Sequence, residues 1–143
     1  MIRVLVVDDS VVIRRLVAQT LDRDPEITVV GTAAAGRLAL PKVAPLDPAG
    51  VTLDIEMPVM DGIETVRALR AAGRRMPVVM FSTLTERGAS ATLDALTAGA
   101  TDYVTKPSGS GSVQTALERV GVALPPELRA RVRRGPAAAA ARA

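Results

Sequence analysis

The 143-residue sequence contains no cysteine and no histidine. Without cysteine, the chain can form no disulfide, no thiolate zinc site and no cysteine nucleophile. Without histidine, it can supply neither a Ser-His-Asp triad nor an imidazole metal ligand, and it cannot carry a phosphohistidine. The enzyme classes that depend on these side chains are therefore excluded for this chain.

Long apolar runs and aromatic residues are also scarce. No stretch approaches the ~20 apolar residues of a membrane span. The apolar run from Val4 to Val7 meets Asp8 and Asp9 at once, which is unlike a signal peptide. We therefore expect a cytoplasmic protein that does not insert into a membrane.

The positive charge lies at the C-terminal end of the chain. The net charge is +3, but residues 125–143 hold five Arg and one Glu, whereas residues 1–124 hold 13 basic and 14 acidic side chains. A near-neutral domain with one Tyr and one Phe lacks the basic face and the aromatic residues that are typical of nucleic-acid binders. We expect no nucleic-acid partner.

Short apolar runs rich in β-branched residues alternate with segments of helical periodicity. The runs predict strands at Ile2–Val7, Ile27–Val30, Val51–Leu53, Pro77–Phe81 and Tyr103–Val104. The periodic segments predict helices after the N-cap Ser10, over about Gly62 to Ala72, over about Arg87 to Ala98, and through Val113, Leu117, Val120 and Leu124.

The helix predicted within residues 33–46 is the weakest of the set. Pro41 interrupts its apolar pattern, and an interior proline removes a backbone hydrogen bond at a cost of ~3 kcal/mol or more. We expect this helix to be short, to be kinked, or to begin near the proline.

The alternation of strands and helices predicts an α/β fold with a doubly wound parallel sheet. Ligands of such sheets bind at the carboxyl ends of the strands, where the winding reverses. If the strand order is 2-1-3-4-5, this edge collects the polar residues that follow four strands: Asp8, Asp9, Asp54, Ser82, Thr83 and Lys106.

Three carboxylates brought together repel one another, and a hard cation such as Mg²⁺ offsets that repulsion. Lys106 could neutralise part of the charge. A carboxylate can also accept a phosphoryl group as an aspartyl-phosphate, a transfer that relies on in-line positioning and on charge neutralisation by metal and Lys. A hydroxyl of Ser82 or Thr83 could donate to a phosphoryl oxygen, and Ser82 is favoured.

Four segments resemble, in order, the response-regulator receiver domain of bacterial two-component signalling: "VLVVDDS", "LDIEMPVMDGIE", "VVMFST" and "GATDYVTKPS". The resemblance covers about residues 1–120 and implies a flavodoxin-like (βα)5 fold. The "STLT" and "TKPS" pieces resemble in particular the regulatory domain of the chemotaxis protein-glutamate methylesterase. In that family a catalytic domain follows the receiver. Because this chain has no histidine for a catalytic triad, we expect that it is not an enzyme itself.

The resemblance also implies roles for single residues. Asp54 would be the phosphoacceptor, with Asp9 as a direct Mg²⁺ ligand, Asp8 as a ligand through water and the Glu56 carbonyl as a further oxygen. Lys106 would contact the phosphoryl group. Ser82 would donate a hydrogen bond to this group, and Tyr103 would be the aromatic residue that responds to phosphorylation. The expected partners are a chemotaxis-type histidine kinase and an output methylesterase domain or protein.

The resemblance leaves alternatives for the function and for the end of the chain. Residues 1–124 would form the receiver, and residues 125–143 would form either a disordered tail or a linker to an output domain. A haloacid-dehalogenase-like phosphatase also uses an Asp nucleophile, but its acid pair comes last, whereas here the pair comes first. A pseudo-receiver that binds a partner without phosphorylation is the other alternative.

Overall fold

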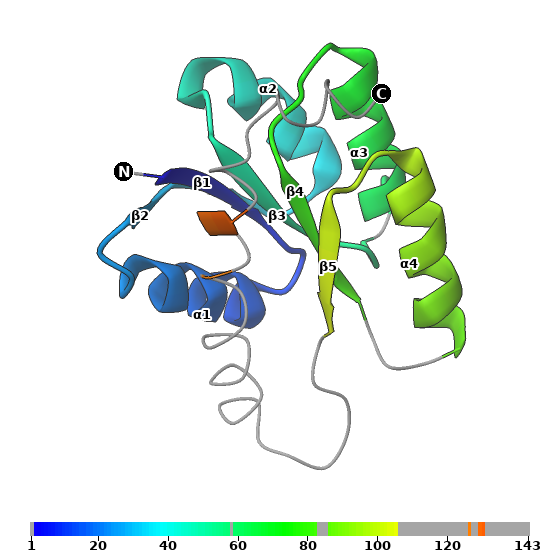
Figure 1. Ribbon diagram of the computed structural model, residues 1–143, viewed down its shortest axis with the longest axis horizontal. Helices are drawn as coiled ribbons and strands as arrows, with labels where there is room; N and C mark the ends of the chain where they lie inside the picture. Colours follow the sequence, from blue (N-terminus) through cyan, green and yellow to red (C-terminus); the bar gives the residue numbers. More distant parts are fainter. Residues whose placement is uncertain (1, 58, 83–85, 106–125, 127–128, 131–143) are drawn as a thin grey trace.

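The computed structural model describes residues 2–57, 59–82, 86–105, 126, 129 and 130 (Figure 1). Its strands are β1 (Ile2–Val7), β2 (Ile27–Ala33), β3 (Gly50–Asp54), β4 (Val78–Ser82) and β5 (Asp102–Thr105). Its helices are α1 (Val11–Asp22), α2 (Gly36–Leu46), α3 (Gly62–Ala71) and α4 (Glu86–Ala98). The last helix predicted from the sequence, through Val113 and Leu124, lies outside the described residues.

All five strands are parallel, and their order is β2-β1-β3-β4-β5. This order confirms the predicted doubly wound, flavodoxin-like sheet. All five predicted strands are present, and most of them extend one to three residues beyond the apolar runs, because backbone pairing continues where side-chain periodicity has already ended.

The alternating side chains of the strands divide the core into two layers. One layer packs strand residues such as Leu5 and Leu53 against α2, α3 and α4, and the other packs Val4 and Val6 against α1. Figure 1 shows α1 and the other helices on opposite faces of the sheet. Each helix in the described ranges is too short or too polar to span a bilayer.

The expectations that the second helix is short or begins near Pro41 are wrong, and a kink at the proline stays a prediction. Helix α2 begins at Gly36 and continues to Leu46, with both Pro41 and Pro45 inside it. The two prolines lie four residues apart on the exposed face, where water can satisfy the carbonyls that lose their helical donor. Buried residues on the other face, Ala39 and Val43, hold the helix against the core.

Arg70 at the end of α3 connects the loops that lead into β4 and β5. Its Nε donates to the Gly99 carbonyl at 3.0 Å, and its Nη1 donates to the carbonyls of Arg74 and Met76 at 3.0 and 2.8 Å. Burial, with the nearby charge of Arg75, lowers the pKa of the Arg70 guanidinium from its usual value. The side chain therefore stabilises the sheet end opposite the carboxyl ends of the strands.

We expect Arg70→Met to lower the free energy of unfolding by about 2 kcal/mol, because it keeps the apolar stem but leaves partly buried carbonyls without their donor. Arg67→Met, at an exposed position of the same helix, is the matched control and should change stability by less than about 0.5 kcal/mol. Urea unfolding followed by circular dichroism measures both. Equal stability of the two variants would contradict this role for Arg70.

Candidate functional site: an acidic pocket at the ends of β1 and β3

The pairing of β1 with β3 brings their terminal carboxylates together. Val7 pairs with Leu53, so that Asp8 follows β1 beside Asp54, the last residue of β3. The Asp8 N–H also donates to the Ala33 carbonyl at the end of β2, at 3.1 Å. The carboxyl ends of three adjacent strands therefore meet at this edge, as the sequence predicted.

Asp8, Asp9 and Asp54 form a compact cluster in which one carboxylate oxygen of each lies within 4.8 Å of the others. Asp8 is 1% exposed and Asp54 is 2% exposed, whereas Asp9 is open to solvent. Two buried carboxylates beside a third make a strongly negative pocket with one open side. Such a donor set fits a hard divalent cation, which is bound by a few carboxylate and carbonyl oxygens and keeps several waters.

Contacts from Ser10 and α1 hold Asp8 in place. The Ser10 N–H donates to Asp8 Oδ1 at 2.9 Å, and Ser10 Oγ accepts from the Ile13 N–H at 3.3 Å as the N-cap of α1. Arg14, one turn into α1, donates from Nη1 to the Asp8 carbonyl at 2.9 Å. The sequence predicted the cap but not this use of Arg14, which no sequence pattern signals.

The loop after β3 orients Asp54 from the other side. The Glu56 N–H donates to Asp54 Oδ1 at 3.3 Å, and Asp61 caps α3 by accepting from the Glu64 N–H at 2.9 Å. The helix predicted over about Gly62 to Ala72 is confirmed as α3, and Asp61 is its N-cap.

Gly62 has a second role that sequence reasoning missed. A Cβ at Gly62 would lie 2.8 Å from Ile55 Cα and closer still to the Asp54 carbonyl oxygen. Only glycine therefore allows α3 to begin directly behind the Asp54 backbone. The signal for this constraint was present in the sequence as the Asp-Gly step at a helix start.

The other site residues predicted from the sequence are only partly described. Ser82 ends β4 next to β5, but its side chain, Thr83 and Lys106 lie outside the described part of the chain. Tyr103 is half-exposed on β5, where it pairs with Met80. The structure thus brings the three acids together, and the role assigned to each site residue stays a prediction.

A family model of the response regulator receiver domain matches residues 4–118 of the chain. The chain belongs to this family. The receiver is 65% identical over 135 residues to a protein-glutamate methylesterase/protein-glutamine glutaminase of Nocardioides sp., and the match covers 94% of the receiver and 37% of that relative. A protein of the same name from Trichodesmium erythraeum is 47% identical, with 88% and 36% covered.

Solved structures agree with this assignment. The response regulator domain of Thermotoga maritima CheB superposes with a TM-score of 0.83 and 40% identity, covering 95% of this receiver and 99% of that chain. Chemotaxis protein CheY4 of Vibrio cholerae gives a TM-score of 0.65 and 35% identity, covering 84% and 96%.

This receiver spans little more than a third of the length of the methylesterase relatives. The matched part is the receiver and not the catalytic methylesterase domain, so the expectation that this chain is not itself the enzyme is confirmed. Membership of the receiver family also argues against the haloacid-dehalogenase-like alternative.

Val59, in the loop between β3 and α3, has a strained backbone. Its φ is +69°, in the left-handed region that β-branched residues rarely adopt, and its side chain is 88% exposed. Such a conformation costs about 1–3 kcal/mol and persists only where the surroundings impose it. Here the Gly62 N–H donates to the Ile55 carbonyl at 2.9 Å, which joins the two ends of the loop, and Asp61 caps α3 at the second end of the loop.

We expect Val59→Asn to raise the free energy of unfolding by about 1 kcal/mol, because asparagine tolerates the left-handed conformation. Val12→Asn, an exposed change in the helical backbone of α1, is the control and should give no stabilisation. Urea unfolding measures both variants. A Val59→Asn protein no more stable than the parent would contradict the presence of strain.

Proposed function

We propose that this receiver is a phosphorylation-controlled switch of a chemotaxis-type two-component pathway, with Asp54 as the phosphoacceptor. The observation that supports this most is the placement of Asp54 at the end of β3, buried, with oxygens of Asp8 and Asp9 within 4.8 Å. Three acids packed in this way are unfavourable without a cation, which argues for a charge-handling role over a structural one.

In the proposed reaction, one carboxylate oxygen of Asp54 attacks the phosphorus of a phosphohistidine on a kinase. The new O–P bond forms as the N–P bond breaks, and the electron pair remains on the imidazole nitrogen, which takes up a proton. The Glu56 N–H, bonded to Asp54 Oδ1, fixes the orientation of the carboxylate for in-line attack.

Asp8, Asp9, Asp54 and the Glu56 carbonyl would hold a Mg²⁺ ion, with Asp8 acting through a water molecule. When bound, the ion neutralises charge that develops on the transferring phosphoryl group. Asp9 is the open acid of the three and is therefore suited to direct ligation.

The remaining roles rest on the resemblance to receivers. Lys106 would contact the phosphoryl oxygens, Ser82 or, less favourably, Thr83 would donate to one of them, and Tyr103 would respond. The phosphoryl group adds roughly two negative charges, which would bias an equilibrium between two arrangements near α4 and β5.

The donor would be a chemotaxis-type histidine kinase, because CheY4 is by name a chemotaxis protein and this receiver resembles the regulatory domain of the chemotaxis methylesterase. The output would be a methylesterase domain or partner, and the protein would act in the cytoplasm. Residues 125–143 would then form the connection to that output.

We expect acetyl phosphate with Mg²⁺ to add one phosphoryl group to this protein, read as the intact mass, and Asp54→Asn to abolish the addition. Asp61→Asn is the matched control, because it removes a nearby negative charge but keeps a helix cap, and it should still be phosphorylated. A folded protein that is not modified would instead support a pseudo-receiver. Addition that survives in Asp54→Asn would mean a different acceptor.

We expect Asp9→Asn to weaken Mg²⁺ binding by about tenfold or more, because one charged ligand is lost from a site with few protein ligands. Isothermal titration calorimetry of the unphosphorylated protein measures the dissociation constant directly. Asp61→Asn again serves as the control and should leave the constant unchanged within about twofold. If both variants lose affinity equally, the ion is held by general negative charge and not by direct ligation.

A further inference from the structure

The turn at residues 22–26, which runs from the last residue of α1 to β2, contains the carboxylates of Asp24 and Glu26. The Asp24 N–H donates to the Leu21 carbonyl at 3.0 Å, and Asp24 Oδ1 accepts from the Glu26 N–H at 2.9 Å. The Glu26 carbonyl in turn accepts from the Ile2 N–H at 2.7 Å, which ties the turn to the start of β1. The Asp24 carboxylate and the Glu26 backbone are therefore held in position by bonds within the turn and to β1.

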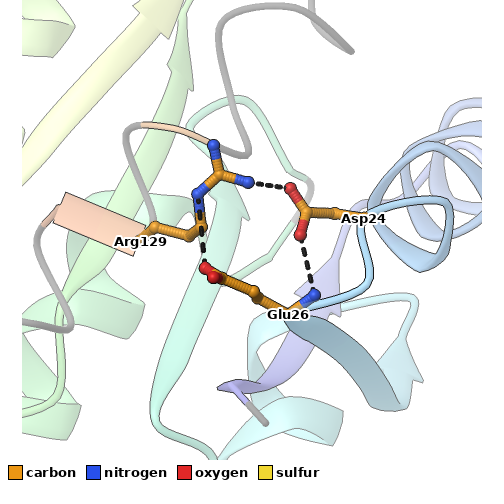
Figure 2. A network of polar contacts seen from close by, with 3 residues as sticks. All are labelled: Asp24, Glu26 and Arg129. Carbon is orange, nitrogen blue, oxygen red and sulfur yellow. Dashed lines mark hydrogen bonds and ion pairs between the residues drawn. The ribbon is translucent and has the colours of Figure 1, made fainter.

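Arg129, far along the chain, binds both of these carboxylates. Its Nη1 pairs with Asp24 Oδ2, and its Nε lies 3.6 Å from Glu26 Oε2 (Figure 2). The Asp24 side chain is only 10% exposed, whereas Glu26 remains half-exposed. The guanidinium thus closes over Asp24 and touches Glu26 at the rim of the contact, a fork geometry that Lys would not reproduce.

The charges of the two segments are complementary. The turn at 22–26 contains three acidic residues and one Arg, whereas residues 126–134 contain four Arg and one Glu. The match to the Thermotoga maritima CheB domain covers 95% of this chain, so it includes part of the region after residue 124. The contact between Arg129 and Asp24 therefore lies within the part of the chain that matches this structure.

We propose that the turn at 22–26 is a docking site for the chain's own C-terminal segment, with Arg129 as the residue that anchors it. The chain at Arg129 is then held against the receiver by this contact. The docking depends on the charges of Asp24 and Arg129 and not on the acidic pocket, so it goes beyond the proposed phosphorylation.

The position of this docking site has a geometric consequence. Ile2 pairs with Ile27 at the amino ends of β1 and β2, whereas Asp8 and Asp54 lie at the carboxyl ends of their strands. The anchor and the acidic pocket are therefore at opposite ends of the sheet. If the proposed output domain follows the receiver, which rests on the proposed function, its connection begins at the end away from the phosphoacceptor.

The test compares hydrogen–deuterium exchange of the peptide that contains residues 126–130 in four forms of the full chain. We expect Arg129→Gln and Asp24→Asn each to speed exchange by at least about threefold, the scale of one partly exposed ion pair. The double variant should be no faster than Arg129→Gln alone, because loss of the guanidinium already removes its contacts with both Asp24 and Glu26. Asp24→Asn keeps the side-chain acceptor for the Glu26 N–H, so the turn itself is preserved.

Arg23→Gln, an exposed arginine in the same turn, is the matched control and should leave exchange unchanged. Molar salt screens the ion pair, so it should speed exchange in the parent protein as the variants do. This arm needs no substitution and therefore stays valid if a variant folds poorly. Exchange that is equal in all forms and insensitive to salt overturns the proposal, and so do additive effects of the two single variants. Phosphorylation measured on Arg129→Gln should equal that of the parent, so that failure of the docking and failure of the phosphoacceptor assignment are distinguished.

Discussion

The repulsion among Asp8, Asp9 and Asp54 is the constraint on which the rest of this receiver depends. Two of the acids are buried, and oxygens of all three lie within 4.8 Å, an arrangement that the chain has to impose against their charge. The pairing of β1 with β3 imposes it, because strand register leaves no other position for Asp8 and Asp54. Burial of the apolar layers on both faces of the sheet stabilises the fold and offsets the repulsion among the three acids.

Helix starts complete the pocket and make it rigid. Ser10 caps α1 directly after the acid pair, and Asp61 caps α3 after the loop that contains Glu56. Gly62 lets α3 begin against the Asp54 backbone, and the short loop between them holds Val59 in a strained conformation. These two caps fix the starts of the helices that follow the acid pair and the Asp54 loop.

The two ends of the sheet serve different purposes. The carboxyl ends of the strands gather negative charge, which suits a cation. The amino ends hold arginines: Arg70 binds the carbonyls of the connecting loops, and Arg129 binds the turn before β2. Separating the reactive end from the end where the C-terminal segment docks allows either one to change without direct contact with the other.

The sequence by itself determined the strands, three of the described helices and the acidic edge, because these follow from periodicities of two and 3.6 residues and from acids placed directly after apolar runs. The tertiary structure decided those features that depend on which face of an element packs against the core. Helix α2 passes through Pro41 because that proline faces water, and the backbone of Val59 is set by the loop's two anchored ends. The pairing of Arg129 with Asp24 joins residues 105 positions apart, and no local pattern encodes such a contact, because only the folded chain brings the two charges together.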